Sequence, residues 1–252
     1  MAPFSSYFIC TSPRSGSTLL CKLLREAGNA GFPESHFHDP SLEKWLSYYG
    51  FRDGEFRTTQ DALKAIFKSA YEHGKGASDV FGLRLQRQSF EFFIEQLRVL
   101  HPTLPDQKSR IKAVFGRVLF IHLTRENKLD QAISYVKAQQ TGLWHMTPDG
   151  TELERLSEPK EAVYDAAAIT AQLALSEQME TEWEAWFAKE QISPLCVTYD
   201  ELSAAPYATL KHVLKTLGLE YKPNDKTALP VAKLADAINR EWAERFRSEA
   251  LS

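Results

Sequence analysis

The sequence predicts a three-layer α/β/α fold with a central, mostly parallel sheet. Short apolar runs of β-strand type alternate along the chain with longer segments whose apolar residues recur at helical spacing. Strands separated by helices need crossover connections, which produce parallel pairing with helices on both faces of the sheet. The 252 residues, of which 43% are hydrophobic and 25% charged, suffice for a single domain over residues 1–252.

Four segments are predicted to be buried strands because they are short, apolar and followed by polar or turn-forming residues. They are Tyr7–Thr11, Val80–Leu85, Val118–Leu123 and Leu195–Thr198, and we expect the first to be central. Ligands of such sheets bind at the carboxyl ends of the strands. The loop after the first strand is therefore the first place to look for a site.

Helical spacing of apolar residues predicts the helices that separate and follow these strands. They are 18–27, 42–49, 62–71, 90–100, 127–140, 162–189 and 206–217, with a further helix within 231–247. Two segments rich in Gly, Pro and polar residues, 28–40 and 147–159, are predicted to be loops, the second of them mobile.

Composition and charge exclude several classes of protein. With 30 basic and 33 acidic residues the net charge is −3, so we expect no general attraction to nucleic acid, and any bound anion needs a local cluster. No apolar run is long enough to span a bilayer. Three cysteines without a Cys-x-x-Cys pair predict neither a disulfide framework nor a zinc site, and no metal centre is expected. These features favour a cytoplasmic protein.

The segment Ser12–Thr18 joins the first strand directly to a helix and reads SPRSGST. Backbone N–H groups at a helix N-terminus form a cradle for anions, and Ser and Thr hydroxyls add donors. Gly16 allows close approach of the backbone, and Arg14 supplies a charged fork. The segment is P-loop-like, but it lacks the Walker A pattern and its lysine, which disfavours a kinase or hydrolase of the P-loop type. The alternative is that these residues only cap the helix.

A second anion-binding pair follows the third predicted strand. Arg125 lies at the end of that strand, and Ser134 lies nine positions later in the next helix. An arginine fork with a serine hydroxyl can bind a phosphate, although each residue alone could be a surface or packing residue. Anion sites at two neighbouring strands suggest a nucleotide with phosphates at both ends.

The sequence resembles sulfotransferases that use 3′-phosphoadenosine-5′-phosphosulfate (PAPS), and within them the Stf0-type, trehalose 2-sulfotransferase-like branch. The similarity runs in order through four blocks: Tyr7–Gly31, Ile121–His145, Val197–Leu202 and Ile238–Arg247. It implies the sulfotransferase fold and transfer of a sulfuryl group from PAPS to a hydroxyl of a carbohydrate or glycolipid-type acceptor. It also suggests a homodimer.

The resemblance also implies roles for individual residues. Arg14, Ser15, Gly16, Ser17 and Thr18 match the loop around the 5′-phosphosulfate, and Arg125 and Ser134 match the pair around the 3′-phosphate. Lys233 falls where a C-terminal segment of the family closes over the cofactor, and Arg84 falls where the branch often has a lysine facing the site.

The general base is the point at which the sequence departs from the family. The branch has a glutamate in the loop after the first helix, and the matching position here is Ser35 in Gly31-Phe-Pro-Glu-Ser-His-Phe37. A serine hydroxyl is a poor base near neutral pH, so Glu34 and His36 are the candidate catalytic bases. In an extended loop these two side chains point to the same side, opposite Ser35.

The acceptor and the activity are open at this stage. Sugar sites use aromatic faces with fixed polar groups, and the candidates are Phe37, Trp45, Trp144 and His145, although the tryptophans could equally pack in a core. Ser35 at the base position favours an alternative reading, a catalytically impaired protein that binds PAPS or its product 3′-phosphoadenosine-5′-phosphate (PAP).

Overall fold

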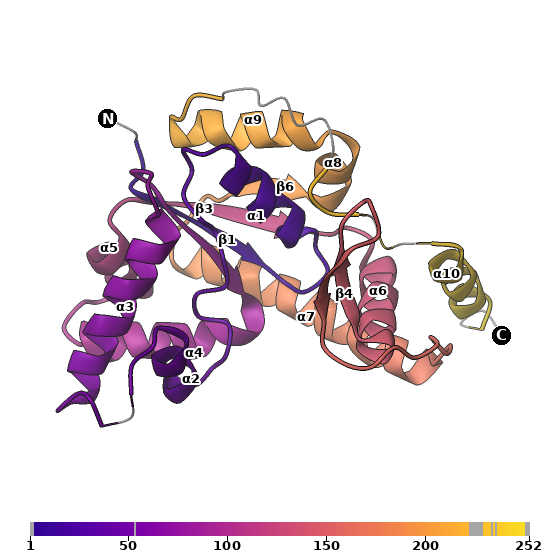
Figure 1. Cartoon of the computed structure of the whole chain (residues 1–252), viewed down its shortest axis with the longest axis horizontal. Helices are drawn as coiled ribbons and strands as arrows, with labels where there is room; N and C mark the ends of the chain where they lie inside the picture. Colours follow the sequence, from indigo (N-terminus) through magenta and orange to yellow (C-terminus); the bar gives the residue numbers. More distant parts are fainter. Residues whose placement is uncertain (1–2, 53, 222–228, 233, 235, 250–252) are drawn as a thin grey trace.

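The computed structural model describes residues 3–52, 54–221, 229–232, 234 and 236–249. At its centre lies a four-stranded, wholly parallel sheet with strand order β2-β1-β3-β6 (Figure 1). Its strands are β1 (Ser6–Thr11), β2 (Phe81–Gln86), β3 (Val118–Thr124) and β6 (Leu195–Thr198). All four predicted strands are confirmed to within a residue or two, and β1 is an internal strand as expected.

Helices cover both faces of this sheet, which confirms the three-layer prediction. Alternate side chains of a strand point to opposite faces. Phe8 and Cys10 of β1 join an aromatic-rich core cluster with helices from one face, whereas Tyr7 and Ile9 join a second, aliphatic cluster on the other face. The first face carries α3 (Thr59–Lys75), α4 (Arg87–Leu100), α5 (Gln107–Phe115) and α7 (Ala166–Lys189); the second carries α1 (Ser17–Glu26) and α9 (Pro206–Leu217) (Figure 1).

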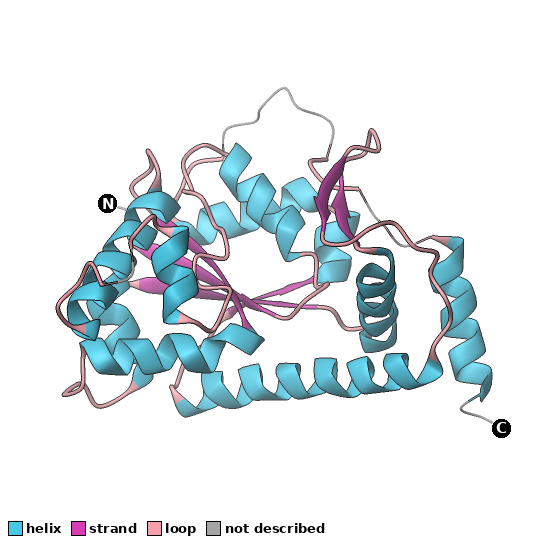
Figure 2. Cartoon of the chain, turned by 60° about the horizontal axis from the view of Figure 1, so that its bottom comes forward, coloured by secondary structure: helices cyan, strands magenta, loops and turns pink. Residues whose placement is uncertain are grey.

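The segment that follows α6 (Lys128–Thr141) differs from the prediction. Residues 147–159 were expected to be a loop, but Glu152–Arg155 (β5) pairs antiparallel with Leu143–Met146 (β4). Figure 2 shows this hairpin apart from the four-stranded sheet. Both strands are only four residues long and neither is buried, and β5, which reads Glu-Leu-Glu-Arg, lacks the apolar pattern that predicts a strand.

The other helices are α2 (Leu42–Tyr48), α6 (Lys128–Thr141), α8 (Tyr199–Ala204) and α10 (Ala237–Glu249). The sequence indicated α2, α6 and α10 and missed α5 and α8, which are short. Within the described part of the chain, no helix combines the length and the hydropathy needed to cross a bilayer.

Helix α1 begins differently from most of the other helices. Among the described residues, six helices have a polar N-cap residue whose side chain accepts a first-turn N–H: Ser41, Thr58, Asp106, Asn127, Asp165 and Thr198. The N-cap of α1 is Gly16, in a left-handed conformation and without a side-chain cap. The first N–H groups of a helix have no partner within it, so the start of α1 offers donors to a ligand.

Candidate functional site

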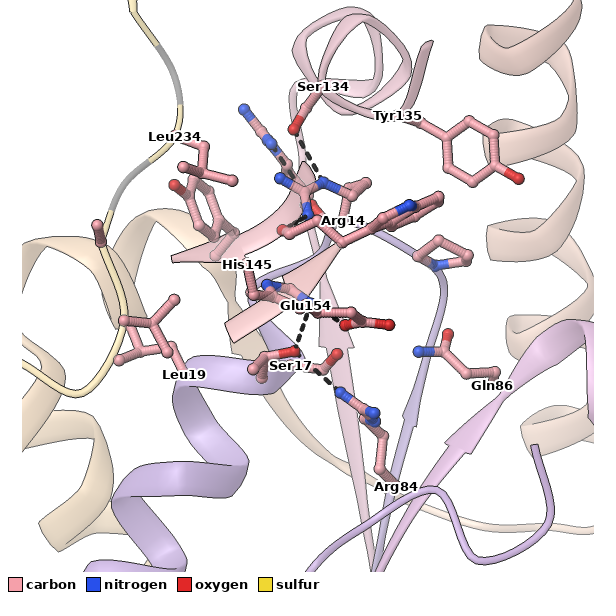
Figure 3. Close-up of a pocket in the computed structure, with 18 of the residues that line it drawn as sticks. Arg14, Ser17, Leu19, Arg84, Gln86, Ser134, Tyr135, His145, Glu154 and Leu234 are labelled. Carbon is pink, nitrogen blue, oxygen red and sulfur yellow. Dashed lines mark hydrogen bonds and ion pairs between the residues drawn. The ribbon is translucent and has the colours of Figure 1, made fainter. Parts of the chain in front are cut away.

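The carboxyl ends of the parallel strands open onto a cavity of about 370 Å³ (Figure 3). The loop between β1 and α1 forms one wall. Arg84 of β2, Arg125 directly after β3 and Tyr199 directly after β6 form others, and the β4–β5 hairpin contributes Trp144, His145 and Glu154. The cavity therefore lies where ligands of open α/β sheets bind.

Four of the five residues predicted in the anion-binding loop line the cavity: Arg14, Gly16, Ser17 and Thr18. Ser15 is fully buried, and its Oγ lies 2.5 Å from Oγ1 of Thr11. The Ser15 side chain therefore holds the loop onto the end of β1.

The loop is fixed from both sides by neighbouring helices. Gln131 of α6 donates its amide to Oγ of Ser12 (2.9 Å) and to the carbonyl of Pro13 (2.7 Å). Trp183 of α7 donates its indole N–H to the carbonyl of Thr11 (3.0 Å). Arg14 has a φ of 63°, a left-handed conformation that costs a non-glycine residue about 1–3 kcal/mol and that only such an anchored loop sustains.

Position 16 requires glycine for two reasons. Its φ is 87°, and a Cβ added there would lie 2.7 Å from Cδ2 of the Tyr199 ring. That ring in turn faces the guanidinium of Arg125, whose Cζ is 4.5 Å from the ring centroid. Sequence reasoning missed Tyr199, although it lies in the block Val197–Leu202 that resembles the family.

The structure brings the two predicted anion-binding groups together. Arg14 donates from Nε to Oγ of Ser134 (3.0 Å) and from Nη1 to the carbonyl of Trp144 (2.6 Å). Arg125 donates from Nη1 to the carbonyl of Arg14 (3.4 Å). Both arginines and Ser134 line the same cavity. Lys233, the cofactor-binding residue predicted in the C-terminal segment, lies outside the described residues.

The two arginines are poorly hydrated and close to each other. Burial and the neighbouring Arg125 lower the pKa of Arg14 to about 10, and burial lowers the pKa of Arg125. Both groups remain protonated at neutral pH. Because both acceptors bonded to Arg14 are neutral, a bound anion would relieve this electrostatic cost. The residues present therefore fit a ligand with several negative charges.

Arg84 links this loop to the segment that follows α1. It donates from Nη1 to Oγ1 of Thr18 (2.9 Å) and from Nε to Oγ of Ser35 (2.8 Å), and it lines the cavity as expected. One guanidinium thus holds a residue of the anion-binding loop and the residue at the family's base position.

The structure does not bring the two predicted catalytic bases to the cavity. The carbonyl of Glu34 accepts from the backbone N–H of Arg84 (3.0 Å), and next to this bridge to β2 the Ser35 side chain bonds to Arg84, whereas Glu34 and His36 are not among the cavity-lining residues. The Glu34 carboxylate instead accepts from Arg25 at the surface (2.9 Å). The His36 ring is buried and bonds through Nε2 to the carbonyl of Phe32 (3.2 Å), and burial lowers its pKa.

The aromatic candidates for acceptor binding divide into two groups. Phe37 and Trp45 belong to the buried core, whereas Trp144 and His145 line the cavity. Nε2 of His145 lies 3.0 Å from Oγ1 of Thr18, and burial together with Arg14 and Arg84 lowers the pKa of His145 to about 3. The imidazole is therefore neutral at neutral pH.

Glu154 is a site residue that the sequence analysis missed. Its Oε2 lies 3.5 Å from Nε2 of His145, and it lines the cavity from β5. Its segment was predicted to be a loop, and its position depends on pairing with β4, so no local signal could have found it.

Comparison with known proteins identifies the family to which this sequence is similar. The model of the Stf0 sulphotransferase family matches residues 6–249. Curated relatives include the trehalose 2-sulfotransferases of Mycolicibacterium smegmatis, 28% identical over 98% of this chain and 96% of that protein, and of Mycobacterium tuberculosis, 28% identical over 97% and 95%.

Solved structures with similarity include the sulfotransferase domain of the Synechococcus olefin synthase (TM-score 0.45, 16% identity, 98% of this chain and 89% of that one). Another is a sulfotransferase from Alicyclobacillus acidocaldarius (TM-score 0.44, 14% identity, 99% and 93%). The family assignment does not depend on these two structures, because the family model alone matches almost the whole sequence. The chain belongs to the Stf0 sulphotransferase family.

Proposed function

We propose that the protein transfers the sulfuryl group of PAPS to a hydroxyl of a carbohydrate or glycolipid-type acceptor. The observation that carries this proposal is the convergence of two arginines, the buried Arg125 and the partly buried Arg14, on the uncapped N-terminus of α1. Such a site favours a ligand with anionic groups at more than one position, and PAPS is a nucleotide of this kind.

In this proposal one set of residues binds each of the two anionic groups of PAPS. Arg14 and residues 15–18 surround the 5′-phosphosulfate, while Arg125 and Ser134 bind the 3′-phosphate. Lys233 is proposed to close over the nucleotide. Arg14 is hydrogen-bonded to Ser134, so it lies between the two proposed phosphate sites, and we expect it to contribute to binding at both.

The chemistry asked of these residues is positioning and stabilisation of charge. Sulfuryl transfer resembles phosphoryl transfer: the reacting oxygens lie in line, and negative charge grows on the leaving oxygen. Arg14 and the first N–H groups of α1 would stabilise that charge. Fixing donor and acceptor in one cavity would supply the remaining part of the rate enhancement.

A sugar acceptor is supported by the relatives and by the cavity wall. The curated relatives are trehalose 2-sulfotransferases by name. Among the cavity-lining residues, Trp144 offers an aromatic face, and Gln86 and Gln88 offer amide groups. Leu156, which is 67% exposed at the cavity edge, could contact an apolar aglycone of a glycolipid.

Calorimetric titration with PAP tests the donor site, with ADP and AMP as controls. We expect micromolar or tighter binding of PAP that is lost without the 3′-phosphate. Equal binding of ADP, or no binding of PAP, would contradict the proposal.

A second candidate function is nucleotide binding without transferase activity. It is favoured by Ser35 at the base position, with its hydroxyl bonded to Arg84, and by Glu34, whose carboxylate is paired at the surface. Tight PAP binding without sulfuryl transfer from PAPS to trehalose or glucose would support this second function over the first.

A further inference from the structure

The proposed reaction releases a proton from the acceptor hydroxyl, and the segment expected to take it does not face the cavity. The Glu34 carboxylate is bonded to Arg25, and the His36 ring is buried against Phe81, 5.8 Å between ring centroids. The Ser35 hydroxyl accepts a hydrogen bond from Arg84 of the cavity wall, and it is not basic. A proton acceptor must therefore come from another element.

The β4–β5 hairpin supplies one. Among the described residues that line the cavity, Glu154 is the only carboxylate. Figure 3 shows it between His145 and Arg84, on the side of the cavity nearest the start of α1. Its Oε2 is 3.5 Å from Nε2 of His145, and the same Nε2 is 3.0 Å from Oγ1 of Thr18 in the anion-binding loop. The Glu154 carboxylate thus reaches the anion-binding loop, where we place the sulfuryl group, through His145 and Thr18.

The hairpin holds this carboxylate in place. His145 and Glu154 are cross-strand partners, so their side chains lie on the same face. The end of the hairpin is tied back to the end of α6, because Arg155 donates from Nη1 to the carbonyl of Thr141 (2.7 Å) and Leu156 donates its N–H to the carbonyl of Gly142 (2.8 Å). The Glu154 side chain is 47% exposed, which leaves it accessible to an acceptor.

We propose that Glu154 is the general base of this protein and that His145 positions it. The inference rests on the proposed function. The acceptor oxygen forms the new O–S bond while its proton passes to the Glu154 carboxylate. The S–O bond to the leaving phosphate breaks, and its electron pair remains on the leaving oxygen.

His145 is suited to positioning because it is partly buried and lies near several cations. Burial first, and then Arg14 of the loop, Arg84 of β2 and Lys22 of α1, oppose its protonation, and Glu154 is the acidic group beside it. The imidazole therefore stays neutral and can bond to Thr18 or to Glu154. His38, which also lines the cavity and is exposed, is the rival proton acceptor to be tested.

The experiment compares Glu154→Gln with Glu158→Gln, a matched change at an exposed glutamate in the same segment, outside the cavity lining. Initial rates are measured with PAPS as donor and trehalose or glucose as acceptor, and PAP affinity is measured by calorimetry. We expect Glu154→Gln to lower kcat by about 10²–10⁴-fold, the usual contribution of a general base, with PAP affinity unchanged. Glu158→Gln should behave as the wild type.

Two further readouts separate a base from a structural residue. The wild-type rate should fall on the acid side as the carboxylate is protonated, and this acid limb should vanish in Glu154→Gln. Added formate should restore part of the activity of Glu154→Ala, because a small carboxylate can occupy the vacated position. His145→Gln should lose less activity and keep the acid limb.

Several outcomes would overturn the inference. If Glu154→Gln retains more than a tenth of the wild-type rate, or if His38→Asn loses the acid limb instead, Glu154 is not the base. A wild-type protein that binds PAP but transfers no sulfuryl group to any acceptor would overturn the proposed transferase function, and this inference with it.

Discussion

The two loops that flank α1 differ in what holds them and in what they face. The loop before α1 is anchored by Gln131 and Trp183 and presents Arg14, Gly16 and Thr18 to the cavity. The loop after α1 follows the edge of β2 through its backbone, bonds to Arg84 through the Ser35 hydroxyl and presents His38 to the cavity. The first loop keeps the pattern expected of an anion-binding site, and the second has lost the expected base.

The proposed reaction needs both binding of the anionic donor and acceptance of a proton, and the two loops differ in which of these they can provide. Binding an anion needs N–H groups and arginines at fixed positions, and the backbone of one loop can provide most of them. Accepting a proton needs one basic atom within reach, which any element around the cavity can supply. Binding of the donor therefore depends on one segment of the chain, whereas the general base can come from the hairpin.

The largest expected effect is on the first loop. Arg14→Ala should weaken PAP binding about 10–100-fold, because hydrogen bonds to charged groups contribute about 1.5–3 kcal/mol. Calorimetry measures this change. Arg25→Ala removes an exposed arginine from the other end of α1 and serves as the control. Unchanged PAP affinity in Arg14→Ala would show that the loop before α1 is not the one that binds the nucleotide.

A smaller effect is expected from the glycines at the two ends of α1. Gly16 and Gly28 both have positive φ, so alanine at either position should lower the free energy of unfolding by about 1–2 kcal/mol. Only at Gly16 would the new Cβ meet the Tyr199 ring. Gly16→Ala should therefore also weaken PAP binding by about tenfold, or about 1.4 kcal/mol. Equal PAP affinities in the two variants would contradict this account.

The third effect concerns acid stability. The pKa of His145 is about 3 in the folded protein, below its ordinary value, so the unfolded chain binds the proton more readily. The contribution of His145 to stability is present above about pH 6.5 and is lost as the pH falls towards 3. Between pH 7.5 and 5, His145→Gln should lose about 1–2 kcal/mol less free energy of unfolding than the wild type. Urea denaturation at the two pH values measures this, and identical losses would be the contrary result.

The smallest effect is expected in the second loop. Glu34→Gln removes an exposed ion pair with Arg25, which contributes about 0–1 kcal/mol to stability. Since the carboxylate faces away from the cavity, the rate of sulfuryl transfer should stay within about twofold of the wild type. A loss of turnover with intact PAP affinity would instead assign the base to the second loop.

The parallel sheet was predictable because each of its strands is a short apolar run. Segments such as Val118–Leu123 are buried on both faces, and this leaves a clear sequence pattern. The anion-binding loop was predictable for a related reason, since its function depends on neighbouring residues of one segment. Arg14, Gly16 and Thr18 therefore appear together in the sequence.

The hairpin and its carboxylate could not be predicted in this way. β5 is mostly exposed and has no apolar alternation, and Pro148 and Gly150 beside it are typical of a loop. Tyr199 reaches the cavity because β6 pairs with the distant β3, and Glu154 reaches it because β5 pairs with the neighbouring strand β4. Glu34 and His36 were expected at the cavity from their position in the chain, but the pairing of their backbone with β2 turns both side chains away.

Arg84 has a consequence for attempts to change what the protein modifies. Its guanidinium is shared between Thr18 and Ser35, so a substitution at position 35 also changes the partner of a side chain that holds the anion-binding loop. Libraries that vary the second loop to select new acceptors will therefore alter nucleotide affinity as well. Acceptor selectivity would be evolved more independently at Leu156 on the hairpin side, whose side chain lines the cavity and is largely exposed.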